Sequence, residues 1–456
     1  MRVVVVGGGI AGLSAARCLE SLAPDAEVVL VERDDVLGGK IRTERVHGFV
    51  VEAAPDSFLT RKERGVGLCD ELGLTEELVA RRPEHHGSFV RHRDHLHPLP
   101  EGLTGMIPTS LEALEQSELL SAEGKARFAA EPDVRPESAG ADESVGSFVS
   151  RRFGREAYEA LVEPLMTGIY GGDGDQLSLR ATFPQLRALE LEHGSVLRGL
   201  SAPVSTERPP FVSLRGGMDV LVEAIAADLG RTDVRVGRAA ALVSRREPGF
   251  EVALADGETI VADGVVLATP AFVTAELLAS LDRELADAHA EIPYASSVVV
   301  TLAFSRADVV PLDGYGYVVP RAEGGDVLAC TWSSQKWEHR APEDAVLLRV
   351  YAGRYGGRDV TTDSDEQVVA LARDELGFLG VNAEPIFARI HRWPRGMPQY
   401  VLGHLDRVER IETALLSLPG LAVAGAAYRG VGIPDCIASG EAAAESVARA
   451  LAGAGV

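Results

Sequence analysis

The chain has 456 residues, of which 46% are hydrophobic and 25% charged, and its formal net charge is −23. This length exceeds what one small core needs and predicts two or three domains. The acidic charge argues against a nucleic-acid partner, because phosphate binding needs a basic surface. No apolar run approaches the roughly 20 residues that cross a bilayer, so we expect an ordinary globular protein of the cytoplasm.

The four cysteines, Cys18, Cys69, Cys330 and Cys436, are far apart in the sequence and form no CxxC pair. We expect them to be reduced and to act as small buried hydrophobic residues, as is usual in a cytoplasmic protein. Residues 2–6 already form a predicted strand, so no signal peptide is expected.

The first predicted element is a strand at residues 2–6, RVVVV, whose uninterrupted β-branched run is typical of a parallel strand buried on both faces. A helix is predicted after it, and a second buried strand at 27–33 contains Glu32. Between the first strand and the helix stands the GxGxxG run Gly7-Gly8-Gly9-Ile10-Ala11-Gly12. Strand, glycines, helix, strand and acid in this order predict a dinucleotide site, with phosphates at the helix N-terminus and Glu32 on the ribose.

The middle of the chain changes character several times. Residues 130–144, rich in Pro, Glu, Ser and Ala, are expected to form an exposed, mobile loop. The other elements are predicted from periodicity and turn residues: helices at 145–170, 219–230 and 437–452, a hairpin leading into a buried strand at 249–270, and strands of a second sheet at 297–304, 314–320, 326–332 and 345–353.

Three further segments favour FAD over NAD as the dinucleotide. The glycine pair of LGGKIRT (37–43), the strand end DGVVLATPA (263–271) and the segment GLAVAGAAYRGVGIPDCIASGEAAAE (420–445) resemble FAD-dependent oxidoreductases of the glutathione-reductase structural class. In that class the last helix points its N-terminus at the isoalloxazine, where the positive helix end stabilises the anion of reduced flavin. The cofactor module is therefore expected to be split between the two ends of the chain.

A set of motifs in fixed order carries a closer resemblance. They are GGKIRTER (38–45), APDSFLTRK (54–62), EPLMTGIYGGDGDQLSLRATFPQL (163–186), LRGGMDVLVEAI (214–225), RWPRGMPQYVLGH (392–404) and GVGIPDCIASG (430–440). Together they resemble the coproporphyrinogen III and protoporphyrinogen IX oxidases of haem biosynthesis, in particular the soluble branch of Gram-positive bacteria. The resemblance runs from residue 2 to about residue 450.

The resemblance implies an α/β fold of the amine-oxidase and glutathione-reductase class, with a Rossmann-type FAD domain, an inserted mixed-sheet substrate domain and a helical domain. The expected domains are an FAD-binding domain (1–85, 208–290 and 408–456), a substrate-binding domain (86–107 and 291–407) and a helical domain (108–207). The implied FAD contacts are Gly7, Gly8, Gly9, Ile10, Ala11, Gly12, Glu32, Arg33, Gly39, Lys40, Arg42, Ala54, Pro55, Asp56, Ser57, Ala240, Ala268, Trp393, Gly425, Val431, Gly432 and Ile433.

The implied reaction removes six electrons from a porphyrinogen and passes them through FAD to O2, with release of hydrogen peroxide. The composition resembles that of a high-GC actinobacterial protein, and therefore of the Gram-positive branch. For that branch the resemblance implies coproporphyrinogen III as the substrate. The implied partners are the porphyrinogen, O2 and the ferrochelatase of the same pathway, and the oligomeric state, monomer or homodimer, stays open. The family usually has Gly where this chain has Ala54, the smallest possible change, and we expect FAD binding to survive it.

The propionates of such a substrate need cations, and three basic clusters offer them: Arg61, Lys62 and Arg64; the stretch 81–97; and Arg389, His391, Arg392 and Arg395 around Trp393. Each cluster is otherwise a solvated basic face, and the His-rich stretch 81–97 has the spacing of an exposed hairpin, so no metal is expected. No catalytic side chain is assigned, since the flavin supplies the electron sink. The candidate substrate contacts are Arg61, Lys62, Thr167, Gly168, Tyr170, Arg392 and Trp393.

Other functions stay open at this point. The enzyme could prefer protoporphyrinogen IX, or act on amines or carotenoid precursors, although only 5% of the residues are aromatic and an amine oxidase is expected to carry an aromatic cage. A protein that holds FAD without turnover and delivers porphyrin to a partner is a further alternative.

Overall fold

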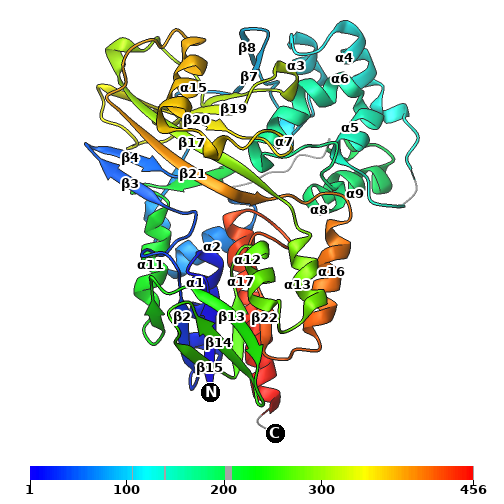
Figure 1. Cartoon of the computed structure of the whole chain (residues 1–456). Coiled ribbons are helices and arrows are strands. Elements are labelled where there is room, and N and C mark those ends of the chain that lie inside the picture. Colours follow the sequence, from blue (N-terminus) through cyan, green and yellow to red (C-terminus); the bar gives the residue numbers. More distant parts are fainter. Residues whose placement is uncertain (105, 138–139, 201–207, 455–456) are drawn as a thin grey trace.

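The computed structural model describes residues 1–104, 106–137, 140–200 and 208–454. It has three parts (Figure 1). A lower part holds both termini, and above it a broad mixed sheet lies beside a group of helices. The chain therefore has the α/β architecture with an inserted sheet and a helical part that the sequence predicts.

The lower part is built on a five-stranded parallel sheet in the order β12-β2-β1-β16-β22. Val4 pairs with Val29 on one side and with Val265 on the other. The β-branched runs are fully buried because helices or strands cover both faces of the sheet. The strands are β1 (Arg2–Val6), β2 (Glu27–Val31), β12 (Asp233–Arg235), β16 (Gly264–Leu267) and β22 (Leu421–Val423).

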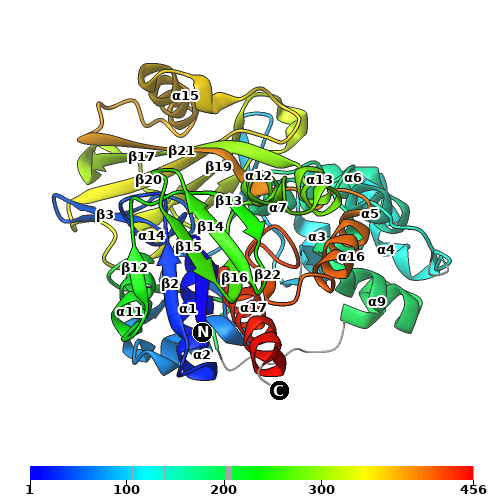
Figure 2. The same cartoon turned by 60° about the horizontal axis from the view of Figure 1, so that its bottom comes forward.

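Different elements cover the two faces of this sheet. On one face lie α1 (Ile10–Leu22), α2 (Glu63–Glu71), α11 (Asp219–Asp228) and α17 (Ile433–Ala454). On the other lie the antiparallel strands β13 (Ala240–Arg245), β14 (Phe250–Leu254) and β15 (Thr259–Ala262), with α12 (Ala271–Leu278), α13 (Arg283–Ala290) and α16 (His404–Leu415) (Figure 2). The predicted hairpin that leads into a buried strand is confirmed as β14, β15 and β16.

The last helix begins four residues before its predicted start at 437. α17 starts at Ile433, and Pro434 stands in its first turn. Proline is tolerated there because the N–H that it lacks would have no partner within the helix. The helix N-terminus consequently includes the expected FAD contact Ile433.

The mixed sheet of the upper part has seven strands in the order β21-β17-β20-β19-β18-β7-β8. All four predicted strands of this sheet are present, whereas β21 was not among the predicted elements. α15 (Asp365–Gly377) packs on its apolar core. The strands are β7 (Phe89–His92), β8 (His95–Pro98), β17 (Tyr294–Ser305), β18 (Gly316–Val318), β19 (Val327–Trp332), β20 (Ala345–Ala352) and β21 (Phe387–Pro398).

The helical part surrounds its own core, in which Phe148, Phe153 and Tyr158 are buried. Its helices are α3 (Leu111–Gln116), α4 (Ala122–Ala129), α5 (Val145–Phe153), α6 (Arg155–Ala157), the π-helical turn η3 (Tyr158–Val162), α7 (Glu163–Tyr170), α8 (Leu179–Thr182), α9 (Pro184–His193) and α10 (Val196–Leu200). Gly171 ends α7 in the left-handed conformation with φ 58°. The predicted helical region and its Gly turn are confirmed.

Short elements connect the three parts. The hairpin of β3 and β4 packs against the mixed sheet, where Phe49 and Val51 contact Ala303 and Leu347. The remaining elements are β3 (Thr43–Val46), β4 (Phe49–Glu52), β5 (Phe58–Leu59), β6 (Leu78–Ala80), β9 (Leu103–Thr104), β10 (Ile107–Pro108), β11 (Phe211–Leu214), α14 (Ser333–Lys336) and the 3₁₀ turns η1 (Thr75–Glu77), η2 (Glu131–Asp133), η4 (Arg306–Asp308), η5 (Arg321–Glu323) and η6 (Val360–Thr362).

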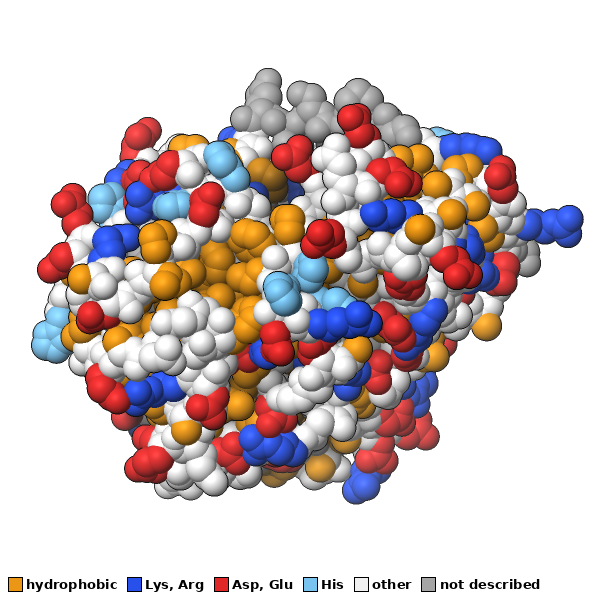
Figure 3. Space-filling model, turned by 90° about the horizontal axis from the view of Figure 1, so that it is seen from above, with side chains coloured by type: hydrophobic (Ala, Val, Ile, Leu, Met, Phe, Trp, Pro, Cys, Tyr) orange, Lys and Arg blue, Asp and Glu red, His pale blue; other side chains and the backbone are white. Residues whose placement is uncertain are grey.

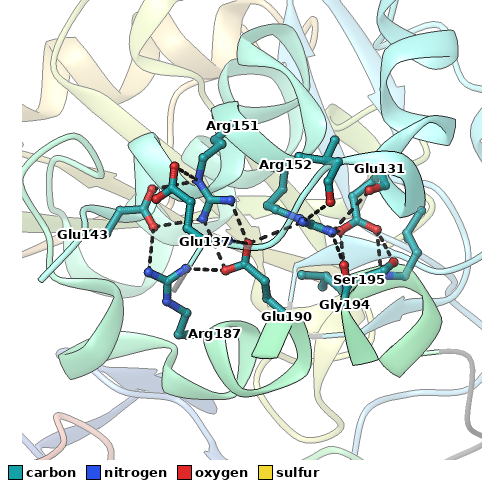
Figure 4. Close-up of polar contacts among 12 residues, drawn as sticks. Glu131, Glu137, Glu143, Arg151, Arg152, Arg187, Glu190, Gly194 and Ser195 are labelled. Carbon is teal, nitrogen blue, oxygen red and sulfur yellow. Dashed lines mark hydrogen bonds and ion pairs between the residues drawn. The ribbon is translucent and has the colours of Figure 1, made fainter. Parts of the chain in front are cut away.

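The prediction of an exposed, mobile loop at 130–144 holds only in part. Among its described residues Arg135, Pro136, Glu137, Gly140 and Ala141 are exposed, whereas Glu131 and Ser144 are buried, and residues 138–139 lie outside the described ranges. Glu131, in η2, is completely buried beside the equally buried Arg152 (Figure 4). Arg152 donates to Glu131 through Nε at 2.6 Å and to the carbonyl of Val134 at 2.9 Å. Composition alone does not predict this buried ion pair, because Arg152 comes from α5, further along the chain.

Candidate FAD site and substrate wall

Residues predicted at the cofactor gather at one edge of the parallel sheet. Gly7 follows β1, Glu32 follows β2, Ala268 follows β16 and Gly425 lies two residues beyond β22. Because these strands are parallel, their carboxyl ends meet at the same edge, where ligands bind in open α/β sheets. The chain thus brings residues more than 400 positions apart to one site.

Three glycines at this edge have distinct geometric roles. A Cβ on Gly12 would lie 1.9 Å from the carbonyl oxygen of Gly7, so α1 packs closely on β1. Gly7 has φ 108°, and a Cβ there would lie 2.7 Å from the carbonyl of Ala268. At Gly9, by contrast, a Cβ would meet nothing within 4 Å. Gly9 is also the N-cap of α1 and offers no side-chain cap, so the space beside this helix N-terminus fits a pyrophosphate.

The carboxylate of Glu32 is held in place by backbone donors. It accepts from the N–H of Gly8 at 2.6 Å and from the N–H of Asp34 at 2.8 Å. Arg42 donates to the carbonyl of Gly39 at 2.8 Å, and its guanidinium also contacts Asp34. An acid fixed in this way, with part of its surface open, suits the hydroxyl groups of a ribose.

Two other predicted contacts of the cofactor differ in exposure. Arg33 is exposed and pairs with Asp34 at 3.3 Å. Lys40 is accessible at its surface, yet the surrounding protein lowers its pKa by desolvation. An accessible ammonium inside a desolvating environment is typical of a side chain that borders a hollow in the protein. Ala240, at the start of β13, pairs with Leu254.

The C-terminal segment completes the site. A Cβ on Gly440 of α17 would lie 2.1 Å from the carbonyl of Ala11, so α17 lies directly against α1. The α17 N-terminus carries Val431, Gly432 and Ile433, and the N–H of Gly432 donates to Asp435 at 3.2 Å.

Segment 53–57 meets the mixed sheet at this site. Trp393 of β21 donates its indole N–H to the carbonyl of Ala53 at 3.0 Å. The carbonyl of Ala54 accepts from Arg349 at 2.6 Å, and Ala54 does not take a positive φ, so its side chain is accommodated without strain. Pro55 follows, and Ser57 donates to Asp56 at 2.8 Å.

Asp56 is the centre of a charged cluster that the sequence analysis did not predict. Lys336 donates to both of its carboxylate oxygens at 3.0 Å, and Trp337 donates its indole N–H at 3.1 Å. The guanidinium of Arg349 lies 3.6 Å from the same carboxylate. Although burial by itself would raise it, the pKa of Asp56 lies well below its usual range because Lys336 and Arg349 stabilise the anion.

The cluster belongs to the face of the mixed sheet that looks toward the lower part of the molecule. Arg349 and Tyr351 alternate along β20 with Leu348 and Val350, which lie in the core under α15. Burial raises the pKa of Tyr351 to about 12, so its phenol stays neutral. The signal that could have found these residues is the polar pair Arg349 and Tyr351 at a two-residue spacing in an otherwise apolar strand.

The basic residues predicted to bind propionates are mostly ion-paired. Lys62 donates to Asp435 at 2.7 Å, and Arg392 pairs with Asp365 at 2.7 Å. Arg61 is exposed and has no ion pair within the part of the chain that the structure describes. Acids also pair with other members of the clusters: Arg64 with Glu71 and Glu441, Arg91 with Glu375, His92 with Glu323, and both Arg389 and His391 with Glu44.

The three candidate substrate contacts on α7 differ in exposure. Thr167 and Tyr170 are buried, and the Tyr170 ring packs edge-on against Phe183 in the helical core. Gly168 is exposed, and a Cβ there would lie 3.4 Å from Val318 of the mixed sheet. Seen from above, apolar side chains gather in a hollow of the surface (Figure 3).

The remaining expectations concern the cysteines, metal binding and membrane-spanning helices. Of the cysteines, Cys69, Cys330 and Cys436 are buried and Cys18 is half-buried, and all four are free thiols. Among the described residues no three His, Cys, Asp or Glu side chains are arranged to hold a metal ion. In the same part of the chain, no helix combines the length and apolarity needed to span a bilayer.

The parallel sheet, the glycine-lined helix N-terminus, the oriented acid and the returning α17 define a dinucleotide-dependent oxidoreductase of the FAD-binding class. The family model for flavin-containing amine oxidoreductases matches residues 10–448. The chain belongs to this family and, within it, to the group of coproporphyrinogen III and protoporphyrinogen oxidases. It is therefore an FAD-dependent oxidoreductase.

Individual relatives cover almost the whole chain. The coproporphyrinogen III oxidase of Bacillus subtilis strain 168 is 36% identical, over 97% of this chain and 96% of its own. That of Staphylococcus aureus strain NCTC 8325 is 32% identical over 98% of both chains. The crystal structure of a protein of Exiguobacterium sp. 255-15, assigned as a protoporphyrinogen oxidase, superposes with a TM-score of 0.89 at 35% identity over 98% of both chains.

Proposed function

We propose that this protein oxidises coproporphyrinogen III to coproporphyrin III, with FAD as the electron carrier and O2 as the final acceptor. The observation that carries the proposal is the 36% identity to a coproporphyrinogen III oxidase along nearly the entire length of both chains. A match of this extent includes the inserted sheet and the helical part, which form the substrate side of the molecule, and not only the cofactor module.

The described geometry fits this chemistry. The FAD supplies the electron sink when bound. The chain's own residues line the cofactor site at the edge of the parallel sheet and exclude water. They also present an accessible apolar face on α7 beside the mixed sheet. A macrocycle of four pyrroles needs such an apolar wall, and removal of six electrons in three two-electron steps reduces three molecules of O2 to hydrogen peroxide. Exposed cations for the carboxylates are offered by Arg61 and Lys40, whereas Lys62 is paired with Asp435.

The experiment compares two substrates on the purified, FAD-loaded protein. Coproporphyrinogen III and protoporphyrinogen IX are supplied in air, and porphyrin fluorescence and hydrogen peroxide are followed. We expect kcat/KM to be higher for coproporphyrinogen III. A higher value for protoporphyrinogen IX would assign the second function of this family, which the Exiguobacterium structure favours.

Other outcomes decide between the remaining functions. If both porphyrinogens are oxidised only at their uncatalysed rate, the proposal is wrong, and amines or carotenoid precursors are tested next. A flavin that no porphyrinogen bleaches anaerobically, in a protein that still binds porphyrin, would indicate a carrier. We further propose a cytoplasmic location and a ferrochelatase as the recipient of the product, which co-purification tests. Light scattering decides between monomer and homodimer.

A further inference from the structure

Helix α7 has an accessible apolar face and a buried face. Leu165, Gly168 and Ile169 follow each other at helical spacing on the accessible side, and 48% of the Ile169 surface is exposed. Met166 and Thr167 lie on the buried side. Because Gly168 stands next to Val318, the accessible face of α7 and strand β18 of the mixed sheet border the same space.

A single buried carboxylate connects this helix to the sheet. Glu163, in the first turn of α7, is only 4% exposed. Its Oε1 accepts from the hydroxyl of Thr167 at 2.7 Å, one turn further along the helix, and its Oε2 accepts from the backbone N–H of Arg321 at 3.0 Å. Arg321 follows β18 after two residues, so this bond joins the helical part to the sheet.

Two guanidinium groups share the charge of Glu163. Arg321 Nε and Arg354 Nη1 each lie 3.9 Å from its carboxylate. Arg354 is 8% exposed and donates through Nη2 to the carbonyls of Val319 and Val327 at 3.0 and 2.8 Å. Its Nε and Nη1 have no hydrogen-bond partner among the residues that the structure describes. An arginine buried to this degree needs a nearby negative charge. We refer to Glu163, Thr167, Arg321 and Arg354 as the Glu163 cluster.

The backbone before α7 departs from regular α-helical hydrogen bonding. The turn η3 is π-helical, a rare geometry that is frequent near functional sites. Pro164, in the first turn of α7, has no N–H to donate to the preceding turn. At the far end of the helix, the backbone N–H of Tyr355 donates to the carbonyl of Gly171 at 2.8 Å, and Gln399 donates to the carbonyl of Tyr170 at 2.8 Å. The Glu163 cluster is a charged contact that holds the first turn of α7 against the sheet side.

We propose that Glu163 is a positioning residue for substrate binding. Its carboxylate, held between Arg321 and Arg354, fixes α7 at its distance from β18 and thereby sets the width of the apolar space beside Gly168 and Ile169. Glu163 itself touches no reacting atom. The inference deepens the proposed function, since it assigns to this space the body of a porphyrinogen.

The test is Glu163→Gln in the FAD-loaded enzyme. The substitution keeps the size of the side chain and removes the charge that balances Arg354. We expect KM for coproporphyrinogen III to rise about tenfold and kcat to stay within about twofold, because a displaced wall weakens binding while the reacting groups are untouched. The matched control is Glu159→Gln, in which an exposed glutamate of η3 loses its pair with Arg155.

A double variant separates positioning from general damage. In a double-mutant cycle of Glu163→Gln and Arg354→Met, we expect the two effects on KM to be clearly less than additive, because either substitution breaks the same contact. An unchanged KM in Glu163→Gln, or a fall in kcat that follows FAD content with KM constant, would overturn the proposal. If Glu163→Gln does not fold, Thr167→Val removes one hydrogen bond of the cluster and should raise KM about two- to threefold.

The same variants remain informative if the proposed function fails. Should the wild-type protein oxidise neither porphyrinogen, hydrogen–deuterium exchange of the α7 amides is compared in the holoenzyme. Faster exchange in Glu163→Gln than in Glu159→Gln supports the positioning role independently of turnover, and equal exchange overturns it.

Discussion

Lys336 and Asp56, 280 residues apart in the sequence, form an ion pair in which the ammonium lies 3.0 Å from both carboxylate oxygens. The side chains are 19% and 11% exposed, so solvent screens the pair little. This pair joins α14, which follows β19 of the mixed sheet, to the segment that carries the predicted FAD contacts Ala54 and Ser57.

The first prediction concerns this pair. Asp56→Asn leaves the buried cations Lys336 and Arg349 without their counter-charge, and we expect the free energy of unfolding to fall by about 3–5 kcal/mol. Urea denaturation of the apoprotein measures this free energy. The FAD content of the purified holoenzyme is read separately from flavin absorbance. Asp25→Asn, at an exposed position, is the control. A change of under about 0.5 kcal/mol in Asp56→Asn, the range of ordinary surface substitutions, would contradict the role assigned to the pair.

A second prediction separates folding from cofactor binding at the glycine run. In Gly9→Ala the new methyl group meets no protein atom within 4 Å, so the apoprotein should fold with a stability within about 1 kcal/mol of the parent. The methyl group occupies the space expected for the pyrophosphate, and FAD affinity should drop at least about tenfold. Titration of apoprotein with FAD checks it. Gly12→Ala is the contrast, since its Cβ would lie 1.9 Å from a backbone oxygen and folding itself should suffer.

A third prediction tests how Glu131 anchors the turn η2. The carboxylate of Glu131 forms an ion pair with Arg152 (Figure 4). It also accepts hydrogen bonds from the backbone N–H groups of Val196 and Leu197 at 2.9 and 3.2 Å. Glu131→Gln should lower the free energy of unfolding by about 3–5 kcal/mol, because Arg152 stays buried with one counter-charge fewer. Limited proteolysis should then cut this segment faster. The exposed Glu123→Gln serves as the comparison, and equal cleavage rates would show that the segment is held by other contacts.

A fourth prediction is a dependence of stability on pH. His289 and His404 are completely buried, and burial lowers the pKa of each to about 4. In the unfolded chain a histidine titrates near 6.5, so between pH 6.5 and 4 the unfolded state binds more protons and stability falls as the pH falls. Each residue accounts for roughly 3 kcal/mol over this interval.

The measurement is urea unfolding at several pH values. His404→Gln, which can still donate to the carbonyl of Tyr428, should show a shallower loss between pH 6.5 and 4. His193→Gln, at an exposed position, should behave as the parent does. A curve for His404→Gln that is parallel to the parent curve would show that His404 is protonated in the folded state in this range.

Local sequence patterns predicted much of the fold. The β-branched runs at 2–6 and 264–267 are central strands because no polar residue interrupts them, and a Gly turn ends α7 as expected. β21 escaped prediction because its residues 389–395, RIHRWPR, include three arginines, a histidine and a proline. These residues read as a basic cluster, and only pairing with β17 makes them a strand.

The candidate site was predictable on its cofactor side and less so on its substrate side. The glycines and Glu32 lie within one βαβ unit, where spacing along the chain fixes distance in space. Lys336, Arg349 and Tyr351 come from other elements, and their approach to Asp56 depends on how two domains pack. The predicted cations Lys62 and Arg392 are ion-paired with Asp435 and Asp365. The sequence did not reveal these pairs, because the two acids are distant in the sequence or on a neighbouring helix.

The sequence by itself determined the cofactor class and the family, because both rest on short runs whose backbone geometry is local and on motifs in a fixed order. Only the tertiary structure decided which charges are balanced and which faces are open. Glu163 looked like one more residue of a helix end, and the fold placed it between two guanidinium groups from the segments that follow β18 and β20. Ion pairs and burial are properties of three-dimensional neighbours, and no spacing along the chain specifies them.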